Sequence, residues 1–138
     1  MLQTFEARLA NALLNHVSQL AFTPSIPVAF PGVSFAPPAG TYLEVTLLTN
    51  LNVNRGVSND STTEHRGILQ VTVASPSNGG IIAPMDIAGK VVAHFERGTV
   101  IYSNDVSLRI EGRPSVAQPL QEADRLRIPV TIPYYAFN

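Results

Sequence analysis

The sequence predicts an α+β fold, in which a mostly antiparallel mixed sheet packs against two helices in the order α-β-β-β-α-β-β-β. Two observations lead to this prediction. Apolar residues recur at helical spacing in two separate segments, whereas the segments between and after them show the two-residue alternation of strands. The clearest case is the stretch 66–80, where an alternating run ends at Asn78, Gly79 and Gly80 and a helical pattern follows directly.

The first half of the chain begins with a predicted amphipathic helix from about Leu2 to Ala21. Prolines end it and bracket a short extended segment, 26–30, which the prolines confine to a sheet edge. Residues 32–40 read as a loop, and residues 41–48 as a strand because they are rich in β-forming side chains.

The stretch 50–64 is the longest one without periodicity, and it is rich in Asn, Ser and Thr. We predict a long mobile loop, about 50–65, that joins two strands as an extended hairpin; loops of this length are usually functional or disordered. In the strand after it, Leu69, Val71 and Val73 share one face, and Gln70 and Thr72 share the other.

The second half begins with a helix from about Ala83, which Gly98 ends. Short strands at 100–103 and 106–111 are joined by a tight turn, and after a connector the last strand spans 125–135. In that strand Pro129 and Pro133 lack backbone donors and, being four residues apart, remove them from the same side. We therefore predict an edge strand, or one with a bulge, as a candidate for a subunit boundary.

Length and composition indicate one domain, 1–138, with an unusually uncharged surface. Charged residues make up 14% of the chain, against roughly a quarter in ordinary soluble domains. Because the centres of protein interfaces are depleted in charge, we expect copies of the chain or a neighbouring ring to cover part of this surface. The alternative is a small monomer whose surface is rich in Ser, Thr and Asn.

Several functional classes find no support in the sequence. The formal net charge is −1 and the cationic residues are scattered, which argues against nucleic acid recognition. Cysteine is absent, and no apolar run approaches the ~20 residues of a membrane helix. His16, His65 and His94 are too far apart for a local metal motif; we expect His16 at a helix border and His94 on a solvated helix face. With no convergent acid, base and nucleophile, we expect neither an enzyme nor a cofactor.

Three segments, in this order, resemble phage tail terminator proteins of the lambda type and related prophage proteins. They are IPVAFPGVSFAPPAGTYLEVTLL (26–48), the strand, turn and helix that begin at Arg66, and RLRIPVTIPYYAF (125–137). Together they span most of the chain. Relatives often carry a tryptophan just before the last strand, where this chain has Glu122, Ala123 and Asp124.

The resemblance implies a structural protein of the virion tail, assembled in the host bacterial cytoplasm. It would form a homohexameric ring, bind the last ring of tail-tube protein, stop polymerisation and offer a docking surface to a head-completion protein. Alternatives are another head-tail joining or minor tail protein, or a small-molecule-binding α+β domain with an enclosed pocket. The candidate contact residues, to neighbouring subunits or to the tube, are Arg55, Asp60, Glu64, His65, Arg66, Arg125, Arg127 and Pro129.

Overall fold

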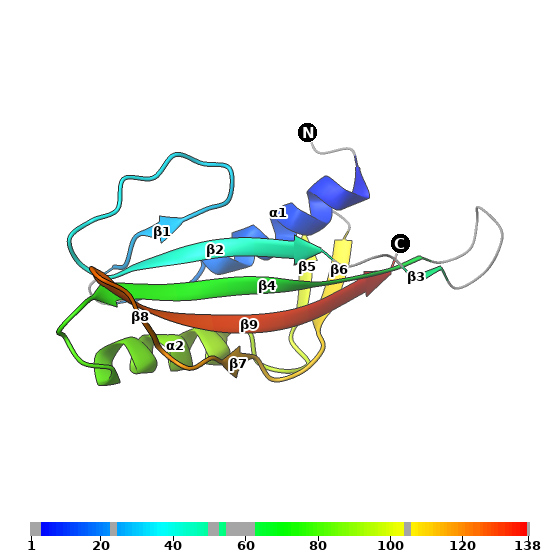
Figure 1. Ribbon diagram of the computed structural model, residues 1–138. Coiled ribbons are helices and arrows are strands. Elements are labelled where there is room, and N and C mark those ends of the chain that lie inside the picture. Colours follow the sequence, from blue (N-terminus) through cyan, green and yellow to red (C-terminus); the bar gives the residue numbers. More distant parts are fainter. Residues whose placement is uncertain (1–3, 23–24, 50–52, 55–62, 104–105, 138) are drawn as a thin grey trace.

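The computed structural model describes residues 4–22, 25–49, 53–54, 63–103 and 106–137 (Figure 1). Within these ranges the fold is α+β, as predicted, with two helices and a nine-stranded sheet. The elements are, in chain order, α1 (Phe5–Ser18), β1 (Val28–Ala29), β2 (Tyr42–Thr49), β3 (Val53–Asn54), β4 (Thr63–Pro76), α2 (Ile82–His94), β5 (Val100–Ser103), β6 (Val106–Ile110), β7 (Ser115–Val116), β8 (Leu120–Gln121) and β9 (Arg125–Phe137). The three strands that the sequence did not predict, β3, β7 and β8, have two residues each, too few to show a period.

The sheet is mixed and mostly antiparallel, and its main path runs β1-β2-β4-β9-β6-β5. β1 pairs parallel to β2, and every other pair in the described residues is antiparallel. The long strands β2, β4 and β9 lie side by side, and β5 and β6 turn away from their direction (Figure 1). β4 and β9 pair without interruption from Glu64 opposite Phe137 to Pro76 opposite Arg125.

β9 lies at the centre of the sheet, so the prediction that the last strand forms a sheet edge is wrong. One side of β9 pairs with β4, and the other side pairs in turn with β8, β7 and β6. The carbonyl oxygens of Pro129 and Pro133 accept hydrogen bonds from the amides of Ala117 and Glu111, at 2.8 and 3.0 Å. Because the N–H and C=O groups of one strand residue point to the same side, the donors that the prolines lack also face this second side.

The prolines explain why the second side of β9 is paired in pieces. Pairing runs over residues 134–136, 130–131 and 126–127, and Pro133 and Pro129 fall in the two gaps. Short partner segments donate to the proline carbonyls there and need no donor in return. The sequence therefore identified the weakened side correctly, although that side is broken up rather than left as an edge.

Both helices cover the same face of the sheet, and the main core lies between them and that face. Alternate residues of β4 and β9, such as Val71 opposite Val130, point into it and are fully buried. Leu13 of α1 and Phe95, just after α2, are also fully buried in this cluster. We call the opposite side of β2, β4 and β9 the helix-free face.

A capping side chain begins α1, and a turn with left-handed backbone angles precedes α2. Thr4 caps α1 because its side-chain oxygen accepts a hydrogen bond from the amide of Ala7, at 3.2 Å. Before α2 the chain turns through left-handed backbone angles at Asn78 and Gly80, with φ of 72° and 79°. The predicted Asn-Gly-Gly break between strand and helix is therefore confirmed.

Candidate assembly surface

The helix-free face brings together most of the candidate contact residues. Side chains that lie opposite one another in an antiparallel pair share a face, and residues two apart on a strand do so as well. The register of β4 with β9 therefore puts Glu64 and Arg66 on the same face as Arg125, Arg127 and Pro129. No described helix covers that face, and the proline-rich loop packs over its β2 end.

Arg66 organises one end of the helix-free face. Its Nη1 donates to both carboxylate oxygens of Glu111, at 2.7 Å each, and its Nε donates to Glu64. The guanidinium also lies over the ring of Tyr135, 5.7 Å from its centroid. Hydrogen bonds to Glu111 and then to Glu64 raise the pKa of Arg66 above its ordinary value. Glu64 is only 2% exposed, and this cation compensates its burial.

Arg125 and Arg127 organise the other end. Arg125 donates to the backbone oxygens of Pro38 and of Gly40, the latter at 2.6 Å, and lies 5.1 Å from the centroid of the Tyr42 ring. It thereby fixes the end of the proline-rich loop to the sheet.

Arg127 forms a second ion-pair group at this end. Its Nε donates to Glu122 at 2.8 Å, and its Nη1 donates to Glu44 at 3.3 Å. The hydrogen bond to Glu122 is the largest of the causes that raise the pKa of Arg127. Glu122 lies in the connector just before β9 and there serves as an ion-pair partner of Arg127.

On β4 and β9, an uncharged strip separates the two charged ends. In the register, Arg66 lies opposite Tyr135 and Arg127 lies opposite Ala74, so the ends are eight residues apart along each strand, roughly 26 Å. Pro129 lies in between, opposite Thr72. A strip with ion pairs at both ends suits recognition of a protein surface, because charged pairs fix orientation and register.

Three candidate residues are not part of this group. Arg55 and Asp60 fall outside the described residues. His65 is only 6% exposed and lies on the helix-covered face, where its ring centroid is 4.5 Å from that of Phe5. Its Nε2 is buried and has no hydrogen-bond partner among the described residues. The structure therefore separates His65 from the surface that Glu64 and Arg66 share.

His16 and His94 form a reciprocal pair that the sequence did not predict. Each Nε2 donates to the backbone oxygen of the other residue, at 3.0 Å from His16 and 2.7 Å from His94. The rings stack with centroids 4.1 Å apart, and both meet the edge of Phe95. The expectation that His94 lies on a solvated face is wrong, because it joins the last turn of α2 to the last turn of α1.

This pair predicts that the protein loses stability in mild acid. Burial lowers the pKa of His16 below its ordinary value of 6.5; the hydrogen bond to the His94 backbone opposes this, and His94 as a charged neighbour lowers it further. The unfolded chain therefore binds a proton more readily than the folded chain, so the free energy of unfolding falls as pH drops below about 6.5. Urea unfolding at pH 7.5 and pH 5 measures the difference.

The control for this prediction is His16→Gln, which removes the titrating ring and keeps a side-chain donor. We expect the variant to stay within about 1 kcal/mol of the parent at pH 7.5, the typical value of one hydrogen bond, and to show a smaller difference between the two pH values. An equal difference in the variant and the parent would mean that other groups cause the loss.

Two kinds of feature are absent from the described residues. They contain no group of three or more His, Cys, Asp or Glu side chains that could hold a metal ion. None of the described helices is long and apolar enough to cross a membrane.

Comparisons with known proteins identify a family that matches this chain and solved structures with a similar fold. Residues 8–134 match the family described as phage tail terminator protein. One solved protein is 26% identical, with a TM-score of 0.83 over 97% of this chain and 96% of its own. A chain from the virion of a native gene transfer agent particle is 17% identical, with a TM-score of 0.60 over 99% of this chain and 100% of its own, which shows a similar fold. No curated protein matches this chain.

Proposed function

This chain belongs to the phage tail terminator family, and we propose on that premise that it caps the tail tube as a homohexameric ring. Its role in the phage tail is structural. In the proposed role the ring binds the last ring of tail-tube protein, stops polymerisation and offers a docking surface to a head-completion protein. The observation that carries the proposal is the family match over 8–134, nearly the whole chain.

The helix-free face supplies a physical basis for such assembly. A head-to-tail contact that closes into a ring repeats one small interface several times, so individually weak contacts add to a firm cap. The Arg66 and Arg127 ion-pair groups are held in place within one subunit, which lowers the entropic cost of presenting them to a partner. We propose that this face contacts a neighbouring subunit or the tube. We further propose that the protein is assembled in the host cytoplasm and ends in the virion; the similarity in fold to a chain of a gene transfer agent virion supports the place in the virion.

The test is the solution mass of the chain, measured by light scattering over a wide concentration range and repeated with tail-tube protein from the same genome. We expect a concentration-dependent hexamer, or a monomer that is recruited to tube ends. A monomer that ignores tube ends would contradict the proposal. Binding to a capsid connector instead of the tube would favour another head-tail joining protein.

Arg66→Lys tests the part that the helix-free face plays in assembly. Lysine keeps the charge that Glu64 needs but loses the planar fork that binds Glu111 and lies over Tyr135. We expect ring formation or tube capping to require at least about tenfold more protein, as for loss of a central interface contact. Circular dichroism checks that the fold is intact.

Lys90→Gln is the control, because Lys90 is exposed on α2 and forms a surface ion pair with Asp86, at 3.4 Å, away from the helix-free face. It should assemble like the parent. If Arg66→Lys and Arg127→Lys both assemble as well as the control, the interface lies elsewhere on the protein.

A further inference from the structure

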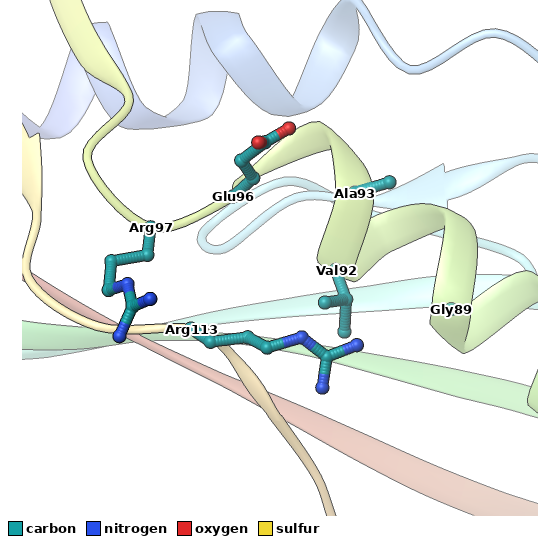
Figure 2. A pocket seen from close by; sticks show the side chains of 6 residues that line it. All are labelled: Gly89, Val92, Ala93, Glu96, Arg97 and Arg113. Atoms are coloured by element: carbon teal, nitrogen blue, oxygen red, sulfur yellow. The ribbon is translucent and has the colours of Figure 1, made fainter.

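A second surface feature lies on the other side of the molecule, beside α2. It is a hollow of about 350 Å³, which we call the α2 hollow. Figure 2 shows that its lining comes from α2, from the turn after α2 and from the segment after β6. The lining residues are Gly89, Val92, Ala93, Glu96, Arg97 and Arg113.

Two arginines give the α2 hollow an uncompensated positive charge. Arg97 and Arg113 are exposed, and their side chains make no hydrogen bond or ion pair with any residue in the described ranges. Figure 2 shows Arg113 reaching along the hollow below Val92, and Glu96 pointing away from both guanidinium groups. Arg66 and Arg127 differ from these arginines, because carboxylates of the same chain already neutralise them.

Gly89 supplies an independent observation in the same hollow. It lies in the middle of α2, where glycine costs roughly 0.5–1 kcal/mol relative to alanine. A Cβ atom added at Gly89 would meet nothing within 4 Å. Packing within the described chain therefore does not require a glycine here, whereas a backbone passing close to the helix from outside would require one.

We propose that the α2 hollow docks an acidic segment of another tail protein. In this arrangement the partner backbone crosses α2 at Gly89, and an Asp or Glu side chain enters the hollow between Arg97 and Arg113. Guanidinium groups suit this ligand because their fixed fork of donors matches the two oxygens of a carboxylate. This inference rests on the proposed function in one respect, because it assumes that the partner is a protein of the phage tail.

The test is a titration of the ¹⁵N-labelled chain, followed by NMR, with a capped pentapeptide that alternates glycine and glutamate. We expect saturable shifts at the amides of Gly89, Ala93 and Arg113. Arg113→Gln should raise the dissociation constant at least about tenfold, and added salt should raise it as well. Gly89→Leu, which fills the hollow with a good helix former, should abolish the shifts while the helix is retained.

Lys90→Gln is the matched control, since it removes one positive charge from the same helix outside the α2 hollow. Its dissociation constant should stay within about twofold of the parent value. Equal shifts with a glycine–glutamine peptide, or no shifts at the hollow, would overturn the proposal.

Two further results would replace the partner with another ligand. Inorganic phosphate that binds as tightly as the peptide would indicate a site for small anions. Self-association that Arg113→Gln weakens, without peptide binding, would make the occupant a second copy of this chain. The titration uses the isolated chain, so its failure is distinct from a failure to cap tubes.

Discussion

Gly67→Ala is expected to destabilise the protein by about 3 kcal/mol, the upper end of the usual cost of overpacking. A Cβ atom at Gly67 would lie 2.5 Å from the Tyr134 hydroxyl oxygen and 2.7 Å from the backbone oxygen of Leu48. Tyr134 lies opposite Gly67 in the register and is only 1% exposed, so its ring has little room to move away. Urea unfolding at pH 7.5 measures the loss.

Gly40→Ala makes the same chemical change in open space, because a Cβ atom there would meet nothing within 4 Å. We expect its stability to stay within about 0.5 kcal/mol of the parent, as for an ordinary surface substitution. If both variants lose the same stability, the cost comes from the backbone rather than from the contact with Tyr134 and Leu48.

Phe95→Ala is expected to cost about 3–5 kcal/mol, the range for truncation of a buried phenylalanine. Phe95 is fully buried just after α2, and its ring centroid lies 4.8 Å from that of His16 and 5.3 Å from that of His94. The substitution would also remove the aromatic ring against which the rings of His16 and His94 pack. We therefore expect lower stability at pH 7.5 together with a weaker dependence on pH between 7.5 and 5.

Tyr102→Ala provides the control for Phe95→Ala, since Tyr102 is 76% exposed on β5. It should lose less than about 0.5 kcal/mol. A small loss in Phe95→Ala, comparable with that of the control, would show that the region between α1 and α2 collapses to fill the space.

The spacing of apolar residues predicted the long helices and strands and which of their residues face the core, because one side of each element is buried. The alternation at Leu69, Val71 and Val73 continues backwards to Gly67 and His65, and all of these residues face the core. The same alternation turns Glu64 and Arg66 to the other face. The burial of His65 was therefore present in the pattern, although its place beside a loop suggested a surface residue.

The sequence holds no comparable pattern that predicts contacts between segments far apart along the chain. The prolines of β9 show which backbone donors are missing, but not that β6, β7 and β8 supply donors of their own. His16 and His94 are 78 residues apart, and their contact arises only when the last turns of two helices meet. Arg97 and Arg113 line the same hollow for a similar reason. Gly89, a glycine within a helical pattern, was the one visible sign of the α2 hollow.

The central place of β9 also has a consequence for the order of folding. β9 pairs with β4 across separations of 49 to 73 residues, and it alone connects β4 to β6. Without β9, the pair β2–β4 and the pair β5–β6 would have no strand between them to join them into one sheet. Long-range pairing of this kind is slow to form. The sheet of a newly made chain can therefore be complete only once β9 has been synthesised, which makes the pairing of β9 the late step of folding.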